Sequence, residues 1–347
     1  MQQSNTRIAW IDALRGFTIL LVVFGHVNNS IGFESYESNV ASFFSAFRMP
    51  MFFFISGFVA YKKQEIYTAS YVVPQFLKKL RVQLVPMFVF FFVYSIWHNG
   101  GVPRFWITGF DKYWFTFVLF EMLAIYYLIS FVSKKLSRDL LWLLILLSLF
   151  GIFALAFLNR DFPGYRLLCL ENLFKYLQFF TLGLYCRKNQ EKFAILLNNE
   201  IFKVSAFCLF IGSYLLCCHS DLLSSFVGGG YVIHFIRDIV IRYTGLFSVL
   251  VIFSAHSEFF SSEKKLPKQM RYVGRRTLDI YLIHYFMIPN LSGLYMYFSG
   301  NANMFIQMLM CISLALLIVM FCIIVSNSLR SSNFISHWLF GQEYSVK

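Results

Sequence analysis

The chain has 347 residues, of which 58% are hydrophobic and only 14% are charged, and its mean hydropathy is +0.63. Because soluble domains carry about 25% charged residues, this composition excludes an ordinary soluble fold and predicts an all-α, polytopic integral membrane protein in contact with membrane lipids. The net charge of +13 is not gathered in a basic, aromatic-interleaved domain, so no nucleic acid partner is expected. The seven cysteines are odd in number and lack CxxC spacing, which predicts neither a disulfide framework nor a metal site.

The apolar segments of the chain are long enough to cross about 30 Å of hydrocarbon, and we expect about ten transmembrane helices. In chain order they cover about 8–30, 40–61, 82–98, 113–133, 140–158, 172–186, 202–219, 231–254, 272–298 and 304–326. No linker or internal repeat separates them. We therefore expect a single transmembrane domain over residues 1–347, with a short cytoplasmic tail at about 327–347.

The distribution of basic residues predicts the orientation of these helices. Short cytoplasmic loops accumulate Lys and Arg. If Arg7 is placed in the cytoplasm, most of the 30 Lys and Arg residues fall on the same side, and the opposite side receives only Arg104, Lys112, Arg160 and Arg166. Both termini are therefore predicted to be cytoplasmic.

The first segment, "WIDALRGFTILLVVFGHV" at 10–27, contains three ionisable residues, Asp12, Arg15 and His26. At about 100° per residue, Arg15 lies about 60° and His26 about 40° from Asp12 in the same direction, so all three share one stripe. Ionisable groups in a membrane helix cost on the order of 3 kcal/mol each and usually face a polar cavity. A structural alternative stays open, in which Asp12 and Arg15 pair to orient the helix and His26 is a packed core histidine.

The axial spacing of this stripe suits a long, extended ligand. Arg15 is near the cytoplasm and His26 lies roughly 17 Å further along the helix. A thioester on a pantetheine arm fits this length, with its phosphates at the cytoplasmic mouth and its acyl carbon at the level of His26.

Two further segments carry buried polar residues. Arg48 lies in the outer half of the second segment beside Pro50, whose missing N–H predicts a kink. Arg48 is therefore expected near His26, either as a substrate-binding residue or as a structural counter-ion. Glu121, in the fourth segment, is costly to bury without a partner and is a second candidate for substrate binding.

The eighth segment carries a polar stripe on its outer half, formed by His234, Arg237, Asp238 and Arg242. Such a stripe suits the binding of a polar acceptor. Asp238 and Arg242 are also spaced for an i,i+4 ion pair, so a purely structural bridge is an equal alternative.

Five motifs follow one another along the chain. The first is Arg15 and His26, with ten residues between them, within "IDALRGF" and "FGH". The others are "FRMPMFFFISGF" at 47–58, "KKLRVQLVP" at 78–86, "YWFTFVLFE" at 113–121 and "VGRRTLDIYLIH" at 273–284. Together they resemble the motifs of the membrane acyltransferase family 3 and span nearly the whole chain. The chain length is similar to that of compact members without an appended hydrolase-like domain.

This resemblance implies an O-acyltransferase of the bacterial cytoplasmic (inner) membrane. Its donor would be cytoplasmic acyl-CoA, most commonly acetyl-CoA, with no metal. Its acceptor would be a hydroxyl of a cell-surface polysaccharide or lipid-linked glycan.

The resemblance also implies roles for individual residues. His26 would be the catalytic base, because imidazole titrates near neutral pH and can take the proton of an attacking hydroxyl. Arg15 and Asp12 would line the donor passage, with Arg15 attracting the anionic coenzyme. The family's cytoplasmic R-x-x-R pair is Lys78 and Arg81 here, and lysine lacks the bidentate fork of arginine.

The block at 273–284 supplies the last candidate, His284, as a substrate-binding residue or as a helix-packing hydrogen bond. Arg271, Arg275 and Arg276 lie in or beside this block and add to the basic mouth for the donor.

A different class of function competes with the acyltransferase hypothesis. Intramembrane charges are equally typical of a multi-pass transporter or flippase for a glycan or lipid-linked sugar. The sequence shows neither the inverted repeat nor the paired broken helices that are common in transporters. A pure scaffold is a third possibility, but it leaves the ionisable stripe unexplained.

Overall fold

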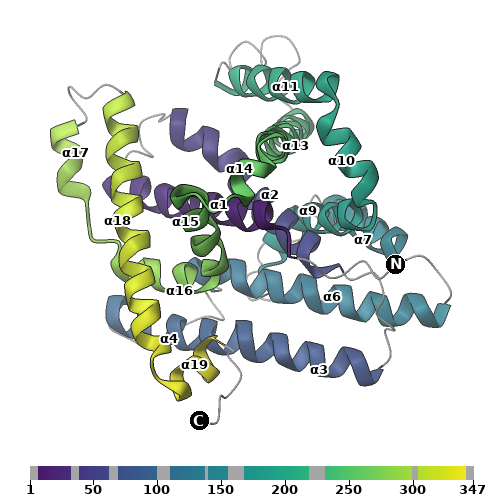
Figure 1. Cartoon of the computed structure of the whole chain (residues 1–347), viewed down its shortest axis with the longest axis horizontal. Helices are drawn as coiled ribbons and strands as arrows, with labels where there is room; N and C mark the ends of the chain where they lie inside the picture. Colours follow the sequence, from purple (N-terminus) through teal and green to yellow (C-terminus); the bar gives the residue numbers. More distant parts are fainter. Residues whose placement is uncertain are drawn as a thin grey trace. The chain divides into compact units, whose positions relative to one another are not determined.

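Every element of the described chain is a helix, and no strand occurs in it (Figure 1). The computed structural model describes residues 7–32, 39–61, 69–99, 110–136, 140–154, 168–218, 231–298 and 304–340. These residues divide into two compact units, each made of discontinuous segments: Met1–Phe52, Asn189–Thr277 and Ile288–Met320 in unit 1, and Phe53–Lys188, Leu278–Met287 and Phe321–Lys347 in unit 2. The predicted all-α class is confirmed.

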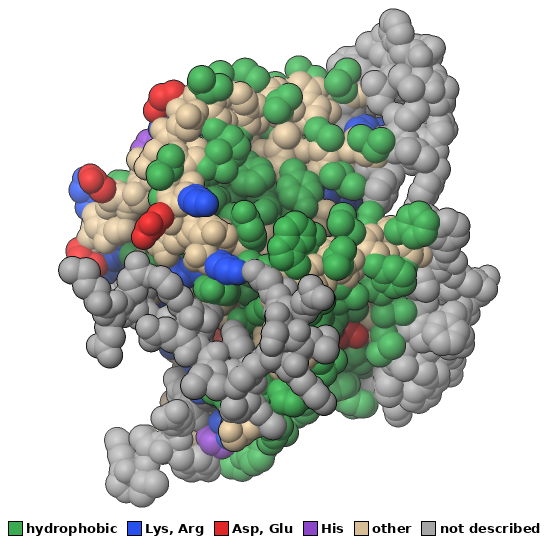
Figure 2. All heavy atoms as spheres, turned by 90° about the vertical axis from the view of Figure 1, so that its right-hand side faces the viewer, with side chains coloured by type: hydrophobic (Ala, Val, Ile, Leu, Met, Phe, Trp, Pro, Cys, Tyr) green, Lys and Arg blue, Asp and Glu red, His purple; other side chains and the backbone are tan. Residues whose placement is uncertain are grey.

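Six described helices are long and apolar enough to cross a membrane: Ala9–Ile31, Phe43–Ala60, Ser70–His98, Trp114–Ser133, Ile236–Ala255 and Phe305–Arg330. A seventh span results if α10 (Gln190–Asn198) and α11 (Glu200–Cys218), bent by 74° at their junction, are taken together. The chain is thus a multi-pass membrane protein, while the number ten and the cytoplasmic termini stay predictions. Figure 2 shows hydrophobic side chains over much of the described surface on one face, as lipid contact requires.

Unit 1 is organised around α1 (Ala9–Ile31), most of whose residues are buried. Its closest neighbour is α15 (Lys265–Arg275), which packs along it (Figure 1). A Cβ atom on Gly16 would overlap the carbonyl group of Met270, and one on Gly274 would overlap that of Asp12. The two backbones therefore touch at a contact that only glycine allows.

The rest of unit 1 packs largely through aromatic rings. α11 lies against α13 (Tyr231–Ala255), and the first part of α2 (Asn39–Ala60) contacts α11 through the rings of Phe43, Phe47 and Phe210. The short helices α14 (Ser257–Ser261) and α17 (Ser292–Phe298) and the first part of α18 (Met304–Arg330) complete the unit.

Unit 2 contains one unusually long helix assembled from α3 (Ala69–Lys79), the π-helical turn η2 (Leu80–Leu84) and α4 (Val85–Asn99). Val85 N–H bonds the carbonyl of Leu80, five residues back, directly before Pro86, which has no N–H to donate. The predicted start of this helix at residue 82 is therefore wrong. Lys78 and Arg81 lie within a continuous helix and not in a loop before it.

α6 (Trp114–Leu136) lies beside this long helix and follows η3 (Asp111–Tyr113). α7 (Leu140–Ala154) packs on α9 (Leu170–Lys188), where the hydroxyls of Ser148 and Thr181 lie 3.0 Å apart.

The predicted continuous helix at 272–298 is also wrong. This stretch forms the end of α15, then α16 (Thr277–Met287) and then α17. α15 ends where Arg276 N–H bonds the carbonyl of Val273, and Pro289 lies in the break before α17. Hydropathy alone does not detect such breaks, because the residues on both sides remain apolar.

The segment predicted as a tail at 327–347 is helical over most of its described length. α18 continues to Arg330, and α19 (Asn333–Phe340) follows it and packs on η2 and α4.

The Gly16 and Gly274 contact gives a direct test of the packing of α1. We expect Gly274→Ala to lower the free energy of unfolding by about 1–3 kcal/mol, because its methyl group meets backbone that cannot rotate away. Gly212→Ala in α11 is the matched control, since a Cβ there has no neighbour within 4 Å. Thermal unfolding in detergent micelles measures both, and equal midpoints for the two variants would contradict this packing.

Candidate functional site

The first candidate residues lie at the beginning of α1. The carboxylate of Asp12 accepts hydrogen bonds from Nε and Nη2 of Arg7, at 2.5 and 3.1 Å. The predicted pair between Asp12 and Arg15 is thus replaced by a pair with Arg7, which precedes the helix and fits the bidentate geometry. Arg15 is half-buried and has no hydrogen-bond partner among the described residues.

The second part of the candidate site lies near the other end of α1. His26 is half-buried there, next to Gly25. A Cβ on Gly25 would overlap Nη1 of Arg48, so the guanidinium of Arg48 lies directly against the backbone of α1 beside His26. Arg48 on α2 thus reaches α1 at the level of Gly25, next to His26 in the chain, and its role as a substrate-binding residue or a structural counter-ion stays a prediction.

Unit 1 also contains the polar stripe on α13. Asp238 pairs with Nη2 of Arg242 at 3.3 Å and lies 3.6 Å from Nη2 of Arg237. The i,i+4 bridge predicted as the structural alternative therefore exists, but one carboxylate faces two guanidinium groups. Nε of Arg237 is buried and has no hydrogen-bond partner among the described residues. His234 lies on the first turns of α13, and its side chain is outside the described part of the structure.

Unit 2 contains the residues predicted to bind the donor's phosphates. Lys78 is exposed at the end of α3, and Arg81 is half-buried in the π-helical turn. Nη1 of Arg81 lies 3.3 Å from Nε2 of His337 on α19. Sequence reasoning missed His337, since nothing local to α19 indicates a partner 256 residues away.

Two further candidates lie in unit 2. Oε2 of Glu121 is buried on α6 with no hydrogen-bond partner among the described residues, which is unusual for a carboxylate. His284 is fully buried on α16, and its Nδ1 lies 2.7 Å from the carbonyl oxygen of Tyr281 and 3.1 Å from that of Ile280. Nδ1 of His284 therefore donates within its own helix, as the packing alternative predicts.

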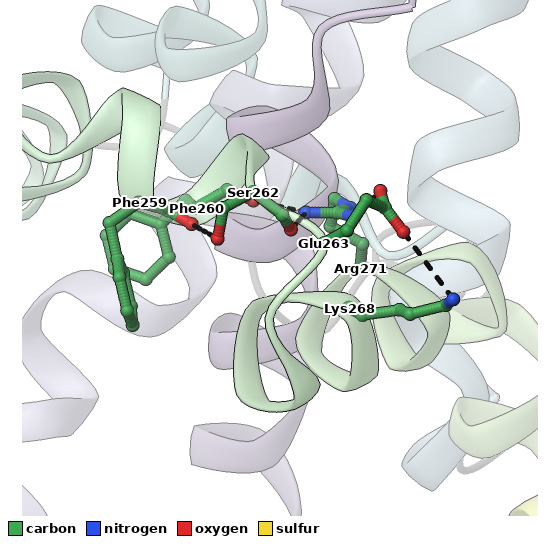
Figure 3. Close-up of polar contacts among 6 residues, drawn as sticks. All are labelled: Phe259, Phe260, Ser262, Glu263, Lys268 and Arg271. Atoms are coloured by element: carbon green, nitrogen blue, oxygen red, sulfur yellow. Dashed lines mark hydrogen bonds and ion pairs between the residues drawn. The ribbon is translucent and has the colours of Figure 1, made fainter.

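Arg271 has a structural role that differs from the predicted one at the basic mouth. Its Nη1 donates to the carbonyl oxygens of Phe260 and Ser262 at 2.8 and 2.5 Å, and its Nη2 bonds Glu263 at 2.6 Å. Figure 3 shows this guanidinium next to Ser262 and Glu263, in the chain that joins α14 to α15, with Lys268 also reaching Glu263. Arg271 thus fixes the entry into α15.

Lys112 is a second polar centre that the sequence did not single out. Its ammonium group donates to the hydroxyl of Tyr94 and lies 4.6 and 5.5 Å from the ring centres of Tyr94 and Tyr285. The hydroxyl of Tyr281 donates to the backbone carbonyl oxygen of Lys112 at 2.7 Å. These contacts hold the start of α6 against α4 and α16. The described residues contain no group of three or more His, Cys, Asp or Glu placed to hold a metal ion.

Comparison with known proteins adds one finding to this geometry. A family model for the acyltransferase 3 family, described as an acyltransferase domain, matches residues 8–326. No curated protein and no solved structure gives a significant match. The match includes α1, α2 and α13 and ends within α18.

The contact between Gly25 and Arg48 supports a prediction that separates site geometry from stability. Gly25→Ala displaces only the mobile end of Arg48, so we expect at least a tenfold loss of activity with an unfolding midpoint close to that of the parent. Gly212→Ala is again the control and should retain full activity. An active Gly25→Ala variant would show that the position of Arg48 beside His26 is not needed.

Proposed function

Because the chain belongs to the acyltransferase 3 family and is therefore an acyltransferase, we propose that it transfers an acyl group, most commonly acetyl, from cytoplasmic acyl-CoA to a glycan hydroxyl. The acceptor is a cell-surface polysaccharide or lipid-linked glycan, and the site of action is the bacterial cytoplasmic membrane. The observation that carries this proposal is the arrangement on α1, where Arg15 has no hydrogen-bond partner among the described residues and His26 has the guanidinium of Arg48 beside it.

His26 is the proposed catalytic base. Its imidazole accepts the proton of the acceptor hydroxyl while the hydroxyl oxygen attacks the thioester carbonyl. The C–S bond then breaks, the acyl group remains on the acceptor as an ester, and the proton passes to the sulfur of the leaving coenzyme. Arg48 is the proposed donor to the oxygen that becomes negative during the attack, because its guanidinium lies next to Gly25.

Cations supply the proposed contacts to the donor. Arg15 attracts the anionic coenzyme near the beginning of α1, and Asp12 holds Arg7 at the same level. In unit 2, Arg81 and Lys78 supply further positive charge for phosphates, with Arg81 as the bidentate donor and Lys78 as a point charge.

The acceptor contacts are proposed from the remaining polar groups. Arg237 and Asp238 on α13 offer donors and an acceptor for sugar hydroxyls, together with His234. Glu121 and His284 in unit 2 stay proposals for substrate contact. Oε2 of Glu121 is buried with no hydrogen-bond partner among the described residues, and Nδ1 of His284 is engaged within α16.

The transporter or flippase alternative is not favoured. Intramembrane charge suits both classes, but the family match over residues 8–326 indicates acyl transfer. One bent helix pair, α10 and α11, occurs in the described chain, whereas transporters of inverted-repeat design place two broken helices in corresponding positions.

Substitution of the base tests the proposal. We expect His26→Ala to lower the transfer rate from acetyl-CoA by about 10²–10⁴-fold, because proton removal from the acceptor hydroxyl is lost. His256→Ala is the matched control, since His256 is exposed and lies 3.0 Å from the carbonyl oxygen of Ile252 one turn earlier. Release of coenzyme thiol measures the rate in purified protein, and mass spectrometry of the cell's glycans shows whether an acyl increment is lost. Unchanged turnover in His26→Ala would remove the proposed base.

A further inference from the structure

The helix α19 lies beyond the family match, which ends at residue 326, and yet it packs on the segment that carries Arg81. Figure 1 shows α19 beside α4 at the end of the chain. What α19 contributes therefore goes beyond the family match. Its polar contact is with Arg81, to which the proposed function assigns the phosphates of the donor.

The contact between Arg81 and His337 has a defined direction. A guanidinium group only donates hydrogen bonds, so Nε2 of His337 is the acceptor at 3.3 Å and the ring is neutral at that nitrogen. Arg81 forms no ion pair within the described chain, and its Nε is buried without a hydrogen-bond partner there. His337 thus holds the guanidinium without neutralising its charge.

A carboxylate in the place of His337 would have the opposite effect. It would hold Arg81 more strongly, but it would also compete with an incoming phosphate for the same donors. A neutral imidazole restricts the long side chain and leaves its positive charge available. This combination is what an anion-binding arginine requires.

A second contact holds α19 in place. Arg330, at the end of α18, donates from Nε and Nη2 to the carboxylate of Asp279, each at 2.9 Å, and Ser326 donates to the same carboxylate. The guanidinium of Arg330 lies 4.2 Å from the ring centre of Phe340, which is buried at the end of α19. α19 is therefore fixed to α18 near one end while His337 reaches Arg81.

From this arrangement we propose that His337 is a positioning residue, which orients the guanidinium of Arg81 toward the phosphates of the acyl donor and makes α19 part of the donor site. This inference rests on the proposed function, because it assigns Arg81 to an acyl-CoA donor. It adds a residue outside the family match and a role for the end of the chain.

The experiment compares two donors with the purified full chain: acetyl-CoA, and acetyl-pantetheine, which has the same thioester and no phosphate. In His337→Ala we expect KM for acetyl-CoA to rise about fivefold with kcat unchanged, the effect of one lost hydrogen bond. KM for acetyl-pantetheine should not change. His337→Gln, whose amide oxygen can accept from Arg81, should restore most of the affinity for acetyl-CoA.

Two controls separate positioning from folding. Phe334→Ala removes an exposed side chain from the same helix and should leave both KM values unchanged. In an Arg81→Ala background, His337→Ala should have no further effect on KM for acetyl-CoA, because the two residues act through one contact. If His337→Ala does not fold, His337→Phe keeps a ring and removes the acceptor.

The outcomes are distinguishable. If the parent protein transfers no acetyl group from acetyl-CoA, the proposed function itself fails. If it does, and His337→Ala leaves KM for acetyl-CoA unchanged or raises KM for both donors equally, then α19 only packs and the positioning role is overturned.

Discussion

The backbone contact between α1 and α15 is the constraint on which the candidate site of unit 1 depends. Gly16 and Gly274 bring the main chains of the two helices so close that a Cβ at either position would overlap a carbonyl oxygen of the other helix. Arg15 is the neighbour of Gly16, and His26 lies further along the same rigid helix. The positions of Arg15 and His26 therefore depend on the close packing of α1 on α15 at Gly16 and Gly274.

The ion pairs in the described chain leave the arginines Arg15 and Arg81 without a carboxylate that accepts a hydrogen bond from them. Asp12 accepts its hydrogen bonds from Arg7, outside the helix, and Arg15 has no hydrogen-bond partner among the described residues. Arg81 is held by the neutral ring of His337 and by no carboxylate in the described chain. In a low-dielectric environment an unpaired cation has an unfavourable solvation free energy, and binding of an anionic ligand offsets it.

Sequence patterns predicted the parts of the fold that depend on composition and periodicity. The all-α class, the segments 8–30 and 113–133, and the approach of Arg48 to the level of His26 follow from hydropathy, helical spacing and the position of Pro50. Hydropathy gave no signal for the division of 272–298 into three helices, since the breaks lie among apolar residues. The contact of Arg81 with His337 was also invisible, because it joins residues far apart in the chain that share no pattern.

The π-helical turn before Pro86 has a consequence for how the long helix of unit 2 presents its residues. One additional residue in a turn shifts the angular phase of everything that precedes it by about 100° relative to an uninterrupted α-helix. Arg81 lies within the turn itself, as its second residue, and the apolar face of α4 follows the turn. A single additional residue in this turn therefore changes the direction of Arg81 relative to the apolar face of α4, although both belong to one long helix.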